Sequence, residues 1–205
     1  MSVDESPFRS PRQKQEERQA KREACLRAAV RMFNERGFHA TSLEDVAASL
    51  GISKPTIYHY LGNKDQVLLE CVTFGLEQLL DAAESARNAP GMGIDRLRSF
   101  LCRYAEINMD DFGRCVIRTG DEALSPESAA RFRALKRRID TAMRALIEEG
   151  MADGSIAPVD PKMLACTLAG ALNWPARWYD PAGQGKSTDI ARAMVDLLTA
   201  GFAPR

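Results

Sequence analysis

The stretch TSLEDVAASLGISKPTIYHYLGNK, from Thr41 to Lys64, decides the fold of this chain. Its first half carries an apolar stripe at the i, i+3, i+4, i+7 spacing of a helix, formed by Leu43, Val46, Ala47 and Leu50. Thr41 with Glu44 three positions later has the pattern of a capping box, which predicts the start of this helix. Gly51 predicts its end, because glycine takes left-handed backbone angles without a Cβ penalty.

A second, shorter helix is predicted over residues 54–60. Ser53 precedes it as a cap, and Pro55 is tolerated in its first turn because the N–H there has no helical partner anyway. Ile57, with Leu61, gives the inward side. The other positions carry hydrogen-bond donors and flat rings: Lys54, Thr56, Tyr58, His59 and Tyr60. A short polar helix held against an apolar one by a glycine turn is the helix-turn-helix arrangement, whose second helix enters the DNA major groove.

The wider run AAVRMFNERGFHATSLEDVAASLGISKPTIYHYLGNKDQVL resembles the DNA-binding domain of TetR-family (AcrR-type) transcriptional regulators. The shared features are Phe33, Gly37-Phe38, Leu43-x-x-Val46-Ala47, Gly51-Ile52-Ser53, Thr56-Ile57-Tyr58-x-Tyr60 and Lys64-x-x-x-Leu68. Leu61 departs from the pattern, since family members often have Phe there, but the exchange is apolar for apolar. The resemblance implies an all-α fold, with an N-terminal three-helix helix-turn-helix domain joined to a C-terminal helical ligand-binding and dimerisation domain.

Three segments follow from these patterns. A flexible basic arm is predicted over residues 1–15, because Pro7 and Pro11 disfavour a helix there; its basic side chains can reach DNA, with a solvated tail as the alternative. The helix-turn-helix domain is predicted over residues 16–66. It opens with a helix over 16–35 whose buried face is Leu26, Ala29, Val30 and Phe33. Residues 67–205 form the ligand-binding and dimerisation domain.

The second domain reads as helices only. A long helix is predicted after the cap-like pair of Asn63 and Gln66, and later helices begin at Ser125-Pro126 and Asp160-Pro161. The last one is predicted over residues 187–202. The final two helices are rich in small residues, and the resemblance implies that they pair with a second copy. A homodimer is also expected because two-fold dimers read DNA half-sites about one turn (~34–36 Å) apart.

Residue chemistry assigns roles in the predicted DNA interface. Tyr58, Tyr60 and Lys64 are interpreted as phosphate binders that set the register. Thr41 and Ser42 can bind another phosphate at a helix N-terminus. The base-edge readers expected at the start of the recognition helix are Lys54, Pro55 and Thr56, with His59 reaching base or phosphate. As an alternative, one tyrosine of the pair braces the helix packing.

A ligand pocket is expected in the second domain. The segment NWPARWY, residues 173–179, holds both tryptophans, and Pro175 interrupts the helix there. This segment with Asp180-Pro181-x-Gly183 resembles TetR-family regulators of fatty-acid and sterol catabolism, which implies an acyl-CoA or other lipid-like inducer. Candidate ligand contacts are Arg103, Tyr104, Asn108, Trp174, Arg177 and Trp178. The alternatives are an aromatic or hydrophobic drug-like inducer, and tryptophans that fill a dimer interface instead.

Composition narrows the class of protein. Net charge is zero, but residues 1–64 carry 11 Lys+Arg and 8 Asp+Glu, which leaves −3 for the rest and fits DNA binding at one end only. The five widely spaced cysteines, without C-x-x-C, indicate reduced thiols in a cytoplasmic protein, and no membrane segment or cofactor is expected. An enzyme is disfavoured, because both histidines lie near the DNA-reading element and no Glu-x-x-His or phosphate-cradling glycine loop occurs. We therefore predict a repressor released from its operator by a small molecule; a helical partner-binding module without DNA activity is the alternative.

Overall fold

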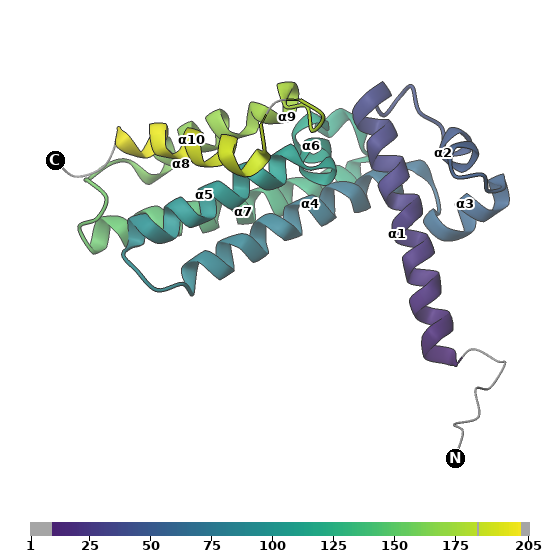
Figure 1. Cartoon of the computed structure of the whole chain (residues 1–205), viewed down its shortest axis with the longest axis horizontal. Coiled ribbons are helices and arrows are strands. Elements are labelled where there is room, and N and C mark those ends of the chain that lie inside the picture. Colours follow the sequence, from purple (N-terminus) through teal and green to yellow (C-terminus); the bar gives the residue numbers. More distant parts are fainter. Residues whose placement is uncertain (1–9, 184, 202–205) are drawn as a thin grey trace, which may run out of the picture. The chain divides into compact units, whose positions relative to one another are not determined.

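The structure is a computed structural model that describes residues 10–183 and 185–201, and all regular secondary structure within those ranges is helical (Figure 1). The all-α prediction is therefore confirmed. The chain divides into two compact units, one up to Val67 and one from Leu68 onward.

The first unit contains α1 (Pro11–Arg36), α2 (Leu43–Ser49) and α3 (Lys54–Leu61), which all contact one another. The buried face of α1 includes the predicted Leu26, Ala29, Val30 and Phe33. The helix begins earlier than the predicted Glu16, because Ser10 and Gln13 form a capping box and Pro11 takes the first helical position, where proline is favoured. The rest of the predicted arm, residues 1–9, lies outside the described residues.

The start of α2 differs from the predicted capping box by one residue. Ser42 is the cap: its hydroxyl accepts from the backbone N–H of Asp45, and the Asp45 carboxylate accepts from the N–H of Ser42. Thr41 faces inward instead, where its hydroxyl donates to the carbonyl oxygens of Gly37 and Met32 at 2.9 and 3.3 Å. As predicted, Gly51 ends the helix with a left-handed φ of 65°.

The second unit begins within α4 (Lys64–Arg87), which the Asn63–Gln66 pair caps as predicted, with Asn63 Oδ1 accepting from the N–H of Gln66. The later elements are α5 (Gly93–Met109), α6 (Asp111–Arg118), a short 3₁₀ turn (Asp121–Ala123), α7 (Pro126–Ala152), α8 (Pro161–Asn173), α9 (Pro175–Trp178) and α10 (Ser187–Ala200). The last helix ends before the predicted Phe202, which lies outside the described residues. Pro175 begins α9, directly after the end of α8, so the helix is interrupted at this proline as predicted.

Helix α5 is the centre of the second unit, because it contacts α6, α7, α8, α9 and α10. Its side chains Leu97, Phe100 and Leu101 are fully buried, together with Phe132 and Leu146 of α7. Burying side chains of this size contributes about 1.5–3 kcal/mol each, so this core supplies most of the stability of the unit.

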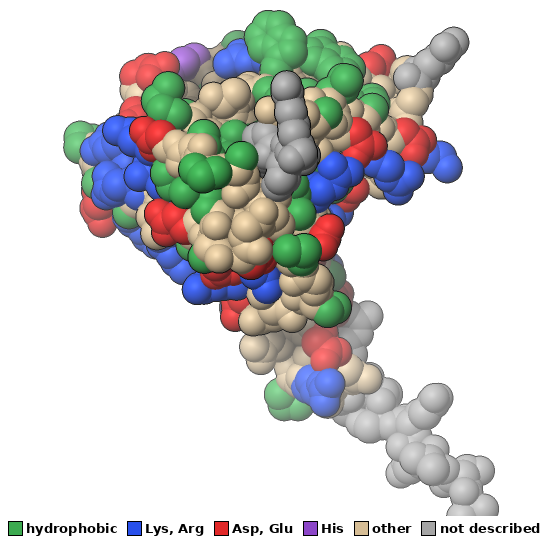
Figure 2. Space-filling model, turned by 90° about the vertical axis from the view of Figure 1, so that its left-hand side faces the viewer, with side chains coloured by type: hydrophobic (Ala, Val, Ile, Leu, Met, Phe, Trp, Pro, Cys, Tyr) green, Lys and Arg blue, Asp and Glu red, His purple; other side chains and the backbone are tan. Residues whose placement is uncertain are grey.

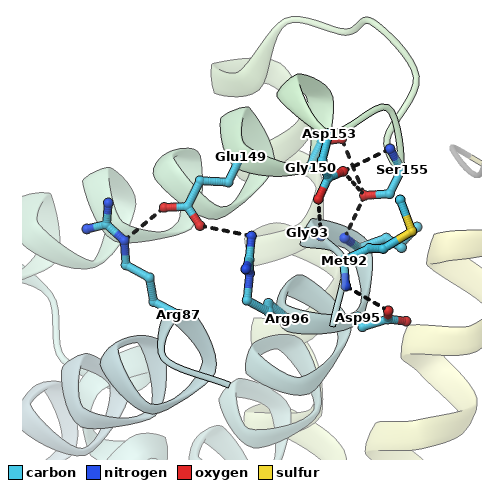
Figure 3. Close-up of polar contacts among 10 residues, drawn as sticks. Arg87, Met92, Gly93, Asp95, Arg96, Glu149, Gly150, Asp153 and Ser155 are labelled. Atoms are coloured by element: carbon cyan, nitrogen blue, oxygen red, sulfur yellow. Dashed lines mark hydrogen bonds and ion pairs between the residues drawn. The ribbon is translucent and has the colours of Figure 1, made fainter. Parts of the chain in front are cut away.

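The start of α5 lies directly against the end of α7 (Figure 3). A Cβ atom added at Gly93 would lie 2.3 Å from Cα of Gly150, so the two backbones touch and only glycine fits. The turn after α7 caps α5 from outside: Asp153 Oδ2 accepts from the N–H of Gly93 at 2.6 Å, and Ser155 Oγ accepts from the N–H of Ile94 at 2.9 Å. The orphan N–H groups of α5 are thus satisfied by a segment distant in sequence.

We expect Asp153→Ala to lower the urea midpoint of unfolding by roughly 0.5 M at pH 7, because it removes this cap. Hydrogen bonds from the Ser155 hydroxyl and from the Gly93 and Ser155 N–H groups lower the pKa of Asp153 below its ordinary value. The folded pKa lies below the unfolded one, so the stabilisation is complete above the unfolded pKa of about 3.9 and is lost as pH falls through the folded pKa. Urea titrations at falling pH should therefore show the gap between wild type and variant closing in acid. The control is Glu148→Ala, an exposed acid near the same helix end; a gap that persists at low pH would contradict this account.

Candidate DNA interface and effector pocket

Helix α3 presents a polar surface to solvent because its apolar side packs against α1 and α2. Ile57 and Leu61 are buried, whereas Lys54, Pro55, Tyr58 and His59 are exposed. Ser53 precedes the helix, but its hydroxyl bonds the Thr56 hydroxyl at 2.8 Å instead of capping a backbone N–H. The predicted base-edge readers Lys54, Pro55 and Thr56 thus occupy the first turn of a helix whose inner side is fixed.

Glu44 of α2 holds two of the predicted DNA contacts, a role that the sequence did not reveal. Its Oε1 atom lies 2.6 Å from Nζ of Lys54 and accepts from the hydroxyl of Tyr58 at 3.2 Å. The Lys54 ammonium also lies 5.8 Å from the centre of the Tyr58 ring. The hydrogen bond from Lys54 lowers the pKa of Glu44, and the same contact raises the pKa of Lys54. Both groups are therefore charged at neutral pH, and Lys54 and Tyr58 are oriented before any DNA arrives.

Two other predicted contacts rest on aromatic rings. Nζ of Lys64, the first residue of α4, lies 4.3 Å from the ring centre of Phe38, and burial lowers the pKa of this lysine. Phe38 in turn packs edge-on against Phe33 of α1. The half-buried ring of Tyr60 lies edge-on to His59, with 5.4 Å between the ring centres. Tyr60 is thus the tyrosine of the pair with the larger share in packing, and Tyr58 the more exposed one.

Thr41 and Ser42 do not offer free hydroxyls for a phosphate. The Thr41 side chain is buried and bound to backbone carbonyls, as described above. The Ser42 hydroxyl donates to Asp45 Oδ2 at 2.7 Å, so an approaching phosphate would meet a carboxylate. We therefore omit the Thr41 hydroxyl from the candidate interface. The reason is the one-residue shift of the cap, which turns Thr41 inward.

The second unit has a cavity of about 330 Å³, open to the surface, between α4, α5, α6, α7 and α8. Most of its wall is apolar: Leu76, Leu79, Val116, Ile117, Ile139, Met143, Ala165 and Ala169. The polar lining comes from Tyr104, Thr119, Lys136, Asp140, Cys166 and Asn173. A cavity of this size with both apolar and polar side chains in its wall is typical of a site for a small molecule.

Asn173 is the polar centre of this cavity, and the sequence did not single it out. Its Oδ1 atom accepts from the Tyr104 hydroxyl and from Nδ2 of Asn108, both at 2.9 Å. These two donors orient the amide, which leaves its Nδ2 group as a donor for a ligand. The predicted Tyr104 thus lines the cavity, while the fully buried Asn108 supports it from behind.

The other predicted ligand contacts do not line this cavity. Arg103 pairs with Glu106 beside a separate surface hollow, and Arg177 is exposed. Trp174 and Trp178 are 64% and 49% exposed, so in the single chain they face solvent. Figure 2 shows apolar side chains grouped along the upper edge of one face of the second unit, where Figure 1 places α8, α9 and α10.

Within the described ranges, no helix is both long and apolar enough to span a membrane, and no cluster of His, Cys, Asp and Glu side chains is arranged to hold a metal ion. All five cysteines are free thiols. Burial raises the pKa of Cys115 to about 11 and that of Cys71 well above its ordinary value, which keeps both as unreactive thiols. The fold and sites therefore define a class: a helix-turn-helix DNA-binding regulator with a ligand cavity in a second helical unit.

Comparison with known proteins identifies the family. The model described as "Bacterial regulatory proteins, tetR family" matches residues 26–71, and the one described as "Tetracyclin repressor-like, C-terminal domain" matches residues 90–202. Because the second match alone covers more than half of the 205-residue chain, the protein belongs to the TetR family of transcription regulators. It is thus a DNA-binding regulator and not an enzyme, as predicted.

Individual relatives agree along most of the chain. The transcriptional repressor KstR2 of Mycolicibacterium smegmatis is 26% identical over 195 residues, which covers 89% of this chain and 91% of the relative. The solved structure of the TetR-family regulator PfmR from Thermus thermophilus superposes with a TM-score of 0.77 at 32% identity, covering 85% of this chain and 96% of that one. The structure of AibR in complex with isovaleryl coenzyme A and operator DNA shares the fold, with a TM-score of 0.75 at 24% identity over 86% of this chain and 96% of that one.

We expect Glu44→Gln to raise affinity for unrelated DNA by about two- to fivefold, because it removes a negative charge beside Lys54. The same change should reduce the preference for the operator by a similar factor, since Lys54 and Tyr58 lose the group that orients them. Anisotropy titrations on an operator and on a scrambled duplex, at fixed salt, measure both effects. The control is Glu77→Gln, an exposed acid on α4. An unchanged ratio of the two affinities would show that Glu44 does not orient the readers.

Proposed function

We propose that the protein is a cytoplasmic, homodimeric transcriptional repressor that binds operator DNA through α2 and α3 and leaves it when a small molecule fills the cavity of the second unit. The observation that carries the DNA half is α3 itself: an eight-residue helix, buried on one side, that exposes Lys54, Pro55, Tyr58 and His59 on the other. The repressor KstR2 supports the sign of regulation.

The interface residues divide by chemistry. Lys54 and Thr56 at the start of α3 read base edges, with Lys54 suited to guanine and the Thr56 methyl to the methyl of thymine. Tyr58, Tyr60 and Lys64 bind phosphates and set the register. Lys64 also begins α4, whose later residues Leu76 and Leu79 line the cavity, so one continuous helix joins a DNA contact to the ligand site.

A second copy of the chain is the proposed partner of α8 and α10. Large apolar side chains are exposed there, with Met163 at 61% and Leu197 at 79%, and Trp174 and Trp178 of the α8–α9 segment are exposed as well. Gly170 of α8 also faces open space, since a Cβ atom there would meet nothing within 4 Å. Exposed apolar faces of this kind mark association sites, and a two-fold dimer presents two recognition helices to two half-sites.

The proposed effector is a carbonyl compound with an apolar body, such as the acyl thioester of coenzyme A. Eight apolar side chains line the cavity, and the Nδ2 donor of Asn173 suits a carbonyl oxygen. AibR, whose structure holds isovaleryl coenzyme A with operator DNA, supports this ligand class through its fold. Release of DNA requires that the effector bind the DNA-free state more tightly than the DNA-bound state.

Fluorescence anisotropy on duplexes from the region upstream of the gene tests this function. Wild type should bind one duplex with an affinity that falls as salt rises, and an acyl-CoA series should include a member that reverses binding. Lys64→Ala should weaken binding to every duplex and reduce the slope of log affinity against log salt by about one, because one phosphate contact is lost.

The matched control is Arg137→Ala, an exposed basic residue of α7 in the second unit, which should leave the slope unchanged. Equal slopes for wild type and Lys64→Ala would remove Lys64 from the interface. Binding that no duplex sequence favours would overturn the DNA assignment and favour a partner-binding module. Specific DNA binding that no acyl-CoA reverses would support the DNA-binding assignment and reject acyl-CoA as the effector class.

We expect Leu197→Glu to convert the dimer into a monomer, because it places a charge within the proposed interface. Light scattering coupled to gel filtration should give wild type about twice the chain mass of 22.6 kDa and the variant that mass alone. Operator affinity should fall roughly 100-fold or more, since the second half-site no longer binds as part of the same particle. Thr141→Glu, which puts the same charge on an exposed position of α7, should stay dimeric. A monomeric wild type would reject the interface.

A further inference from the structure

Three arginines gather where α6 meets α9 in the second unit. Arg114 and Arg118 lie one helical turn apart on α6, and Arg177 belongs to α9, which contacts α6. Nε of Arg118 donates to the carbonyl oxygen of Ala176 at 3.1 Å, directly beside Arg177 in the chain. The guanidinium carbon of Arg114 lies 5.7 Å from the ring centre of Tyr179, two residues beyond Arg177.

This grouping is electrostatically unfavourable as it stands. Burial, followed by the positive charges of Arg114 and Arg177, lowers the pKa of Arg118. Among the described residues, no carboxylate lies within ion-pair distance of Arg114 or Arg177, although other arginines of the unit, such as Arg133 and Arg144, have such partners. Nε of Arg114 is also buried without a hydrogen-bond partner. Buried donors are normally satisfied, so an absent acceptor is the simplest account of this arrangement.

We propose that Arg114, Arg118 and Arg177 form an anion-binding site that holds a phosphoryl group of the effector. A phosphoryl group balances three positive charges better than a single carboxylate does, because it carries close to two negative charges and several acceptor oxygens. The planar guanidinium fork matches its geometry. The assignment to the effector rests on the function proposed above and deepens it, since it adds a nucleotide-bearing end to a ligand whose acyl end was argued from the cavity.

The arginines lie on or next to chain segments that also supply residues to the cavity wall. Arg118 lies between Ile117 and Thr119, which line the cavity, and Ala176 follows three residues after Asn173, the polar centre of the cavity. Under this proposal, one ligand places an acyl group against Asn173 and a phosphoryl group on the arginines. Such a division explains how a cavity of about 330 Å³ can serve a much larger molecule, because only the acyl end needs to enter it.

Calorimetric titration of the full chain with matched probes tests this site. The probes are an acyl-CoA, coenzyme A, inorganic phosphate, and the N-acetylcysteamine thioester of the same acyl group, which lacks every phosphate. Arg114→Gln and Arg177→Gln should each weaken coenzyme A and acyl-CoA binding roughly tenfold or more, and millimolar phosphate should compete. The N-acetylcysteamine thioester should bind all variants alike. Arg137→Gln on α7 is the control and should stay within about twofold of wild type.

Arg177 is exposed, so its variant remains informative if Arg114→Gln disturbs the packing on Tyr179. Coenzyme A affinities equal in wild type and in Arg177→Gln would overturn the site. If phosphate binding depends on the arginines but an acyl-CoA binds no more tightly than phosphate, the assignment of the site to the effector is overturned.

DNA release, measured in parallel, separates the two proposals. Release by the N-acetylcysteamine thioester without arginine dependence keeps the proposed function and rejects this site. Arginine-dependent acyl-CoA binding without any release keeps the site and rejects the effector role.

Discussion

The burial of Ile57 against α1 and α2 is the contact on which the DNA-reading surface depends. A helix of eight residues is too short to be stable alone in water, so α3 exists because its apolar side is held by its neighbours. The hold also fixes its rotation, and with it the direction of every polar side chain on the other side. Glu44 refines this arrangement from α2 by bonding Lys54 and Tyr58. Tertiary packing therefore comes first, and the chemistry of the interface follows from it.

The second unit must be stable although a cavity open to the surface reaches between its helices. The core around α5 is densely packed. The cavity lies between α4, α5, α6, α7 and α8. The polar network of Tyr104, Asn108 and Asn173 lies within this apolar surrounding and is oriented by its own hydrogen bonds. A ligand that binds this cavity in the folded state alone would stabilise the unit.

The sequence predicted the helix-turn-helix unit well, because its signals are local: the period of the apolar stripe, the glycine after α2 and the cap before α4 act within a few residues. The prediction was wrong where two local sequence patterns overlap. Thr41 with Glu44 and Ser42 with Asp45 both fit a capping box, and only the inward position of Thr41 decides between them. Pro11 was interpreted as a helix breaker but begins α1. Contacts between distant segments, such as Asn173 with Tyr104 or Arg118 with Ala176, cannot be predicted from the spacing of residues along the sequence. Likewise, the neighbours of the exposed tryptophans in the sequence do not decide between a ligand pocket and a dimer interface for these side chains.

The contact between Gly93 and Gly150 has a mechanical consequence. Two backbones meet there without a side chain between them, so α5 and α7 cannot move closer at this end, and the cap from Asp153 and Ser155 resists their separation. The cavity-lining Met143 and Ile139 lie roughly 10 and 16 Å along α7 from this point, at 1.5 Å per residue. A ligand that pushes on them exerts its force at a distance from a fixed end. If such a ligand displaces α7, the glycine pair acts as the pivot, and the displacement grows toward the N-terminal end of that helix.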